Sequence, residues 1–415
     1  MSGTTYAEAA LERWEELSFT HALRAVSPER VLREAVGATG ALAGLCFSVK
    51  DLFPVAGVES CAGSLTQVGN VPRTDPPLVA AVRDAGAVVV GKGVCPEFGF
   101  GVDTENRLDG RVVHPNDPSI SPGGSSGGDA VAVSARVVDF ALAGDYGGSA
   151  RWPAQAMGIL GLRCGVGRAP ARDQIGAPAV GQQARLDVPG ILARDASVLR
   201  RVVGVLMGDG ALRPRTRRIV VVPAEALGAV SPEVAAGMED ACRRVQNAGY
   251  DLVDASPVVA EALVEAYAVY RRLRELTDTH DGVRALVDGR EDLLAPSSLA
   301  VLAAAEASTQ TAERGEVEEL VGKEQDVRQR VTMAVEHADA LLLPVAVCGA
   351  IGFGEQVLVG GTAYDATALH GWLRAVSLTG LPAISMPVAE RVSVQLVGPA
   401  GAEARLCDLA EVLVA

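Results

Sequence analysis

Three separated stretches of the sequence each carry a side chain that suits covalent catalysis. Lys50 lies in SVKDLFPVAG, Ser125 in SPGGSSGGDA and Ser149 in GDYGGSARWPA. A serine hydroxyl attacks a carbonyl carbon when a neighbouring base takes its proton, and an uncharged lysine can supply that base. These three residues are therefore candidates for one hydrolytic site, provided that the fold brings them together.

Lysine is rare in this chain, which makes Lys50 informative. All but three of the 37 basic residues are arginines, and the exceptions are Lys50, Lys92 and Lys323. Lysine can lose its proton at accessible pH, whereas arginine cannot, so a retained lysine is a weak indication of a chemical role. The residues around Lys50 are apolar, and burial among them lowers the pKa of an ammonium group, as a lysine base requires.

The glycine–serine run at residues 121–130 has competing interpretations when it is taken alone. Its composition is that of a flexible surface linker. A phosphate-binding P-loop needs a lysine and then a hydroxyl residue after its glycines, and we reject it because Asp129 stands there instead. The GSSGG motif also places Ser126 in the nucleophile position of an α/β-hydrolase. That turn follows a strand, but here three prolines precede it and no downstream histidine lies in a recognisable motif.

The three stretches, in this order and with this spacing between Ser125 and Ser149, resemble the amidase signature family, the Ser–cis-Ser–Lys hydrolases. The resemblance covers most of the chain and includes CPEFGFGVDTEN (95–106), NDPSISPGG (116–124), DVPGILARDASVLRRVV (187–203), SLTGLPAISMPV (377–388) and VQLVGPAGAEARL (394–406). It implies the amidase signature fold and hydrolysis of a carboxylic amide C–N bond through an acyl-enzyme. It implies no metal and no organic cofactor.

The resemblance assigns a role to each of the three side chains. Ser149 is the nucleophile, Lys50 in its neutral form is the base, and Ser125 relays the proton between them. In the family the bridging serine follows a cis peptide bond, which here joins Gly124 to Ser125. Glycines on both sides of Ser125 let the backbone take unusual angles and pack close to the Ser149 loop, which accounts for the composition of the run.

The loop that leads to Ser149 is suited to stabilising an oxyanion. Two glycines let the backbone turn tightly and expose the serine hydroxyl. The N–H groups of Tyr146, Gly147, Gly148 and Ser149 can then converge on one point, where loss of a single donor typically costs about 3–4 kcal/mol in the transition state.

Further positions follow from the resemblance. Asp145 and Arg151 match positions that brace the nucleophile loop, and Gly99 and Gln183 lie in variable segments that form the substrate pocket. The sequence departs from the family's usual pattern at Gly144, which replaces a threonine. Two other departures are Tyr146, which narrows or polarises the pocket at the edge of the oxyanion loop, and Asp129, which stands where a small residue is usual.

Charge and composition restrict the partners and the compartment. The formal net charge is −14, and an acidic surface repels phosphate backbones, which argues against a nucleic-acid partner. The seven cysteines show no CxxC pair and no ligand spacing with histidine, so we expect neither a disulfide framework nor a zinc site. The N-terminus lacks the pattern of a signal peptide, and the longest apolar run, 340–353, is too short to span a bilayer. We expect a cytoplasmic protein with no membrane partner.

Alternating helical and apolar strand patterns predict a single α/β domain over residues 1–415, with a large mixed, twisted central sheet covered by helices on both faces. The signature core spans roughly 45–205, and a variable pocket region spans roughly 207–360, beginning with a surface loop near 207–216. Helices are predicted over 1–36, 78–86, 130–136, 231–249, 259–277, 298–337 and the C-terminus. A buried strand that runs into a turn is predicted over 45–57, and further strands over 87–90, 137–143, 217–223 and 250–255. Strands or buried loops are predicted over 339–347, 381–388 and 392–399.

Several functions fit this sequence. The leading hypothesis is a stand-alone amidase acting on a small-molecule amide, and the resemblance allows for a homodimer. The alternative is the A-type glutaminase subunit of a tRNA-dependent amidotransferase. That function requires a second protein as partner, and the net charge of −14 counts mildly against it. The remaining alternatives are an esterase or acyltransferase, and a catalytically silent binding protein on the same scaffold. Nothing in the sequence identifies the acyl group.

Overall fold

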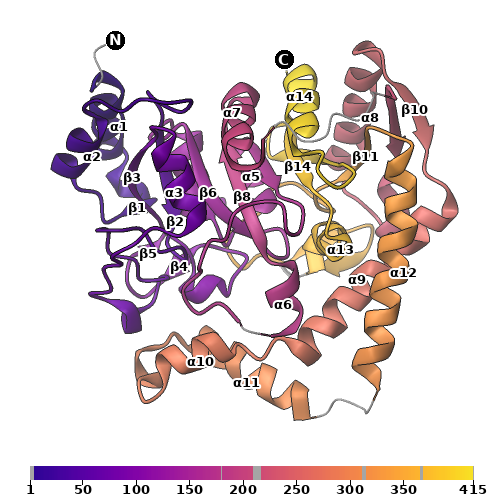
Figure 1. The fold of residues 1–415 in the computed structure, drawn as a ribbon. Coiled ribbons are helices and arrows are strands. Elements are labelled where there is room, and N and C mark those ends of the chain that lie inside the picture. The colour runs from indigo at the N-terminus through magenta and orange to yellow at the C-terminus, as the bar shows by residue number, and fades with distance from the viewer. Residues whose placement is uncertain (1–3, 179, 209–215, 311–314, 365–367, 415) are drawn as a thin grey trace.

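The computed structural model describes residues 4–178, 180–208, 216–310, 315–364 and 368–414. Its centre is an 11-stranded sheet (Figure 1). The strands of this sheet, in chain order, are β1 (Leu23–Arg24), β2 (Cys46–Lys50), β3 (Val88–Gly93), β6 (Phe140–Asp145), β7 (Leu160–Arg163), β8 (Val188–Ala193), β9 (Arg218–Val221), β10 (Asp251–Asp254), β11 (Ala340–Pro344), β14 (Ala383–Ala389) and β15 (Val392–Val397). Two short ribbons stand apart from it, β4 (Glu105–Asn106) with β5 (Gly110–Arg111) and β12 (Val357–Val359) with β13 (Thr362–Tyr364).

The sheet is mixed. Its strands follow the order β1-β3-β2-β6-β8-β7-β14-β15-β11-β9-β10. Strands β3, β2 and β6 are parallel to one another, as are β11, β9 and β10. The strands between these two groups pair antiparallel, and β1 is antiparallel to β3. The fold class predicted from the sequence is thus confirmed, and strands from both the 45–205 and the 207–360 regions enter one sheet.

The helices of the structure are α1 (Thr5–Glu16), α2 (Pro28–Ala35), α3 (Pro77–Asp84), α4 (Gly127–Ser134), α5 (Arg151–Met157), α6 (Gly181–Leu186), α7 (Ala196–Met207), α8 (Pro232–Asn247), α9 (Pro257–Thr277), α10 (Asp281–Val287), α11 (Pro296–Gln310), α12 (Glu316–Glu336), α13 (Gly371–Thr379) and α14 (Glu403–Val414). Figure 1 shows α10 and α11 along one side of the molecule, next to α9 and α6.

Alternate residues of the central strands enter different hydrophobic cores. Phe140 and Leu142 of β6 pack in one core, whereas Ala141 and Ala143 pack in another. Because successive side chains of a strand point to opposite faces, each face of the sheet has its own core. Helices α3, α7, α8 and α14 cover the first face. On the other face, α1, α2, α4 and α5 cover the N-terminal half of the sheet, and α9, α12 and α13 cover the C-terminal half.

The structure corrects several sequence-based boundaries. The helix predicted over 1–36 is wrong in its middle, because α1 ends at Glu16 and β1 separates it from α2; His21 and Ala25 on either side of β1 have φ angles of 54°. The helix predicted over 298–337 begins earlier and includes α11 and α12, and residues 311–314 between them lie outside the described residues. Most of the loop predicted at 207–216 also lies outside them. Strands β7 and β8 are absent from the sequence-based prediction.

The sheet brings two of the candidate segments to one edge. Strand β2 ends at Lys50 and strand β6 ends at Asp145, and the two strands are parallel neighbours. Their carboxyl ends therefore lie side by side, which is where open α/β sheets bind ligands. Ser149 follows four residues after the end of β6, and Ser125 lies in the turn just before α4.

Candidate active site

Lys50 and Ser125 are in direct contact. Lys50 Nζ lies 2.6 Å from Ser125 Oγ, and both side chains are buried. Burial lowers the pKa of the Lys50 ammonium group, because the charged form loses its hydration inside the protein. The structure thus places a lysine that loses its proton more readily than usual against a serine hydroxyl.

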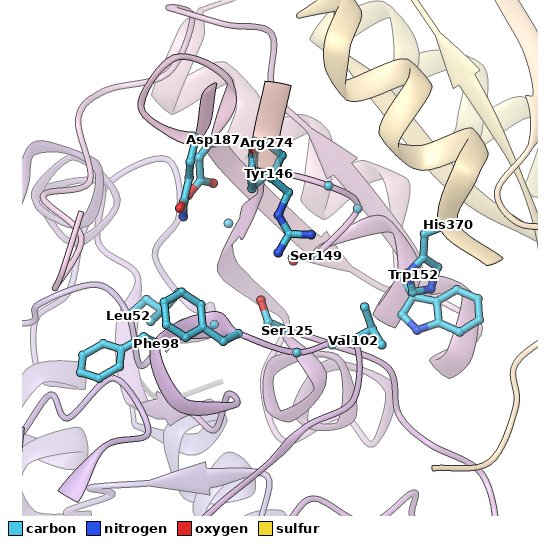
Figure 2. Close-up of a pocket in the computed structure, with 18 of the residues that line it drawn as sticks. Leu52, Phe98, Val102, Ser125, Tyr146, Ser149, Trp152, Asp187, Arg274 and His370 are labelled. Carbon is cyan, nitrogen blue, oxygen red and sulfur yellow. The ribbon is translucent and has the colours of Figure 1, made fainter. Parts of the chain in front are cut away.

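A cavity of about 280 Å³ borders this contact, and Ser149 lies in its wall. The peptide bond between Gly124 and Ser125 is cis, as the resemblance implies. Figure 2 shows the side chains of Ser125 and Ser149 facing the same space. Ser149 is partly exposed, so its hydroxyl is accessible to a ligand in the cavity. Gly99, Gly124, Gln183 and the loop from Tyr146 to Ser149 also line it, so all the residues predicted to form the pocket meet here.

Asp145 is the structural centre of the loop that carries Ser149. Its carboxylate accepts hydrogen bonds from the backbone N–H groups of Gly148, Ala150 and Arg151 and lies 2.9 Å from the Arg151 guanidinium. Burial alone would raise the pKa of this carboxyl group, but Arg151 and Arg163 outweigh burial and bring the pKa of Asp145 down to about 2. Asp145 is therefore a permanently charged anchor for the loop.

Arg151 links the same loop to distant elements. Its guanidinium donates to Gln395 Oε1 on β15 at 2.9 Å and to Ser377 Oγ on α13 at 2.8 Å. The predicted bracing pair Asp145 and Arg151 is thus an ion pair that also joins β6, α5, α13 and β15.

The Gly148 N–H is already engaged, which corrects one predicted oxyanion donor. It donates to Asp145 Oδ1 at 3.0 Å and does not stay free for a ligand in the cavity. Gly148 has a φ of +114°, and a Cβ there would stand 2.6 Å from the Leu373 side chain. Glycine is therefore needed at 148 for backbone conformation and packing.

The glycines around Ser125 allow a close approach between backbones. A Cβ on Gly124 would stand 2.7 Å from the carbonyl carbon of Val102, and a Cβ on Gly128 would stand 2.4 Å from the Val94 backbone. Ser121 Oγ donates to Asp103 Oδ1 at 2.5 Å. The run is therefore a packed turn and not a linker.

Tyr146 is tied to the region around the end of α9. Its hydroxyl donates to Asp278 Oδ2 at 2.6 Å and accepts from Gln182 Nε2 at 2.9 Å. Its ring packs 5.3 Å from that of Tyr270. The Tyr146 side chain therefore belongs to a hydrogen-bonded network at the cavity wall.

Asp129 and Ser126 are buried beneath the site. Asp129 Oδ1 accepts from Ser48 Oγ at 2.6 Å, and burial raises the pKa of this carboxyl group to about 7. Its carboxylate would lie only 2.0 Å from a Cβ on Gly93, so glycine is required there. Ser126 is fully buried and does not line the cavity, which is inconsistent with a nucleophile at that position.

The cavity also contains side chains that sequence reasoning did not assign. Tyr270 and Arg274 come from α9, His370 precedes α13, and Arg374 lies on it. Each pair has the i,i+4 spacing that puts both members on one face of a helix or helical segment, but no motif links the two helices. His370 is fully buried, with its ring 4.5 Å from that of Trp152, and burial holds its pKa well below the usual value.

The structure also bears on metal binding and on membrane-spanning helices. Within the described ranges there is no group of three or more His, Cys, Asp or Glu residues that could hold a metal ion. No helix in the described part of the chain is long and apolar enough to cross a membrane.

The mixed sheet defines an α/β fold, and the Lys50–Ser125 contact beside a cavity forms its candidate serine–lysine site. The family model described as Amidase matches residues 7–407, which is nearly the whole sequence. The chain belongs to the Amidase family, and it is an amide-hydrolysing enzyme.

Individual relatives refine this assignment. The chain is 32% identical to the A-type subunit of the glutamyl-tRNA(Gln) amidotransferase of Natronomonas pharaonis, over 88% of this chain and 94% of that one. It is 30% identical to the protein of the same name from Thermus thermophilus, over 96% and 91% of the two chains. The crystal structure of an amidase covers 100% of this chain and 96% of its own, with a TM-score of 0.87 and 26% identity.

Proposed function

We propose that this chain hydrolyses a carboxylic amide through an acyl-enzyme on Ser149, with Ser125 and neutral Lys50 as its proton relay. The observation that carries the proposal is the 2.6 Å contact between Lys50 Nζ and Ser125 Oγ at the wall of the cavity that contains Ser149. Burial supports a neutral Lys50, since it lowers the pKa of the ammonium group.

The reaction proceeds in two halves. Ser149 Oγ forms a bond to the amide carbon while its proton passes to Ser125, whose own proton passes to Lys50. The C–N bond then breaks, and the leaving nitrogen takes a proton back through Ser125. In the second half a water molecule attacks the resulting ester and gives a proton to Lys50 through Ser125. The bond to Ser149 Oγ then breaks, the same relay returns a proton to Ser149 Oγ, and the carboxylic acid product leaves.

Backbone groups supply the charge stabilisation. With Gly148 occupied by Asp145, the N–H groups of Tyr146, Gly147 and Ser149 are the proposed oxyanion donors. Asp145 and Arg151 hold this loop in place through their ion pair. Preorganised donors of this kind typically supply about 3–4 kcal/mol each to the transition state.

A serine-directed fluorophosphonate probe tests the proposal. We expect the probe to label Ser149 in the purified wild-type protein, and Ser149→Ala to lose both labelling and amide hydrolysis. Ser126→Ala is the matched control, because Ser126 Oγ is buried with no hydrogen-bond partner among the described residues, and it should keep both. Labelling that survives in Ser149→Ala would contradict the assignment of the nucleophile.

The relatives support a second candidate function that uses the same chemistry. Two proteins named as the A-type subunit of glutamyl-tRNA(Gln) amidotransferase match most of this chain at 30–32% identity. In that function the amide is glutamine, and the chain works with a partner subunit in a complex that meets tRNA. The two candidates differ in substrate and in the need for a partner, and agree on Ser149.

A further inference from the structure

Two arginines stand in the cavity wall close to the loop of proposed oxyanion donors. Arg274 of α9 and Arg374 of α13 both line the cavity. A Cβ on Gly147 would lie 3.7 Å from Arg374 Cγ, so the stem of Arg374 passes next to this loop. Figure 2 shows the Arg274 side chain extending from above toward the part of the cavity where Ser149 lies.

These two arginines lack the carboxylate partners that other arginines near the site have, although Arg374 also hydrogen-bonds the Tyr267 side chain. Arg151 lies 2.9 Å and Arg163 3.5 Å from Asp145, and Arg172 lies 2.8 Å from Asp187. In the part of the chain that the structure describes, no carboxylate lies within ion-pair distance of Arg274 or Arg374.

The acidic groups around the pair already have partners. Glu275, which follows Arg274 on α9, is paired with Arg271 and Arg272. Asp278 accepts hydrogen bonds from the Tyr146 hydroxyl and from the Gln183 backbone N–H. Asp187, which also lines the cavity, is paired with Arg172.

Asp278 still acts on Arg274 at longer range: burial lowers the pKa of this guanidinium group, but Tyr270, Tyr146 and Asp278 together outweigh burial and raise it. Among the described residues, the cavity therefore has two charged guanidinium groups without a carboxylate ion pair, and its own carboxylate, Asp187, is already paired.

The positive charge of Arg374 is poorly hydrated, because its side chain is buried. Arg374 is only 6% exposed, and burial lowers its pKa because water no longer stabilises the cation. A buried cation without a carboxylate partner is costly, so a ligand anion beside Arg374 would relieve that cost, and the charged Arg274 would add a second favourable contact. A guanidinium also matches a carboxylate with two parallel hydrogen bonds.

We infer that the substrate is a small amido acid whose carboxylate binds between Arg274 and Arg374 while its amide carbonyl lies at Ser149. The inference rests on the proposed function and adds the substrate class. The cavity of about 280 Å³ suits a short acyl chain. Both arginines also border a second cavity of about 260 Å³, which gives the charged end room beyond the reacting amide.

Binding tests this inference independently of turnover. Calorimetry on the Ser149→Ala protein would compare malonamate, succinamate and glutaramate with propanamide, butanamide and pentanamide, in which a methyl group replaces the carboxylate. The best acid should bind about 10- to 100-fold more tightly than its neutral partner, the usual range for hydrogen bonds to charged groups. Equal affinities for every pair would overturn the inference and leave the nucleophile assignment intact.

Turnover by the wild-type protein adds a second readout. Ammonia release should show the same preference, mainly through a lower KM for the acid. Arg374→Met and Arg274→Met should each remove most of the preference, measured as the ratio of kcat/KM for the acid to kcat/KM for the neutral amide. A cooperative urea unfolding transition shows that each variant is folded. Arg33→Met, an exposed arginine of α2, is the control and should change neither substrate.

Three outcomes would count against these proposals in distinguishable ways. If the arginine variants slow the neutral amide as much as the acid, the pair acts on the reacting carbonyl and the inference is wrong. If glutamine is hydrolysed faster than glutaramate, an ammonium site exists and the inference is overturned in favour of the amidotransferase hypothesis. If calorimetry shows tight acid binding but wild type hydrolyses no amide, the proposed function fails and the anion site stands.

Discussion

At the scale of single residues, the three lysines show what rarity in a sequence indicates. Lys50 and Lys92 are buried on the adjacent strands β2 and β3, whereas Lys323 is on the surface beside Glu319. Lys92 Nζ donates to the Phe53 carbonyl, and burial lowers its pKa to about 8. Two of the three lysines are thus buried, but only Lys50 touches Ser125. Contact, and not rarity, separates the candidate base from the structural lysine.

Replacing Lys50 by arginine puts a permanent positive charge at this position and removes a group that can accept a proton. We expect Lys50→Arg to lower kcat by about 10²–10⁴-fold, because arginine cannot give up its proton and general base catalysis is worth that much. In the wild type, kcat/KM should rise with pH as Lys50 loses its proton, and this rise should begin below the usual lysine range because burial lowers the pKa. The pH profile of ammonia release measures both effects.

Lys323→Arg is the matched control, since Lys323 is exposed and paired with Glu319. Its profile should superpose on that of the wild type. A Lys50→Arg protein with an unchanged kcat would exclude Lys50 as the base.

Asp129 gives a prediction for stability. Its pKa rises from 3.8 to about 7 in the folded protein because of burial. The unfolded chain therefore releases this proton from about pH 4 upward while the folded protein holds it until about pH 7, so stability falls as pH rises through this window. The loss is at most about 1.4 kcal/mol per pH unit for one group. Asp129→Asn should flatten the decline between about pH 5 and 7 in urea unfolding experiments.

The control for Asp129 is Asp84→Asn, an exposed carboxylate of α3, which should leave the slope unchanged. A slope in Asp129→Asn as steep as in the wild type would show that Asp129 does not hold its proton in this window.

At the scale of elements, the nucleophile loop depends on helices and strands that are remote in sequence. Asp145 ends β6, Arg151 begins α5, and Arg151 reaches Ser377 of α13 and Gln395 of β15. The local GDYGGSAR motif therefore has its geometry fixed by segments far along the chain, as the separations of 226 and 244 residues show.

Arg151→Met should be costly for this reason. It leaves the buried Asp145 carboxylate without its closest cation, and breaking a buried pair on one side typically costs about 3–5 kcal/mol. The free energy of unfolding from urea titration should fall by that order. Arg13→Met, which removes an exposed pair with Glu16, should change it by only about 0–1 kcal/mol. Equal effects of the two substitutions would show that the buried network does not stabilise the loop.

The local signals in the sequence predicted the elements near the site and missed what tertiary contacts decide. Lys50, Ser125 and Ser149 lie in glycine-rich or apolar stretches whose order is recognisable. Strand β8 contains Pro189 and Gly190, which disfavour strands, yet it pairs with both β6 and β7. Gly148 was predicted as an oxyanion donor because nothing local shows that Asp145 captures its N–H.

Arg274 and Arg374 illustrate the same limit in the cavity wall. Arg274 lies in the amphipathic helix α9, whereas Arg374 lies in α13, which is buried along its whole length, and the two positions are one hundred residues apart in the sequence. They meet because α9 and α13 pack into one core on the same face of the sheet. The tertiary fold brings these two arginines together as the proposed anion-binding site, and no spacing or motif in the sequence indicates it.

At the scale of the whole molecule, one sheet unites the parts of the site. The ends of β2 and β6 provide Lys50 and the Ser149 loop, and the helices on the C-terminal half of the sheet provide the arginines. The chain carries a net charge of −14, while the cavity wall presents two guanidinium groups that have no carboxylate partner within the described residues. Selection of an anionic substrate therefore depends on this local charge, against the sign of the overall one.

This arrangement predicts activity for the isolated chain. Because the proposed base, relay, nucleophile and oxyanion donors all come from residues 50–149 of one chain, the purified protein should release ammonia from a suitable amide without a second protein. Turnover per molecule should stay constant over a hundredfold dilution of the protein, with Ser149→Ala as the blank. If turnover of glutamine appears only when a partner protein is added, the amidotransferase function suggested by the relatives would replace the stand-alone amidase.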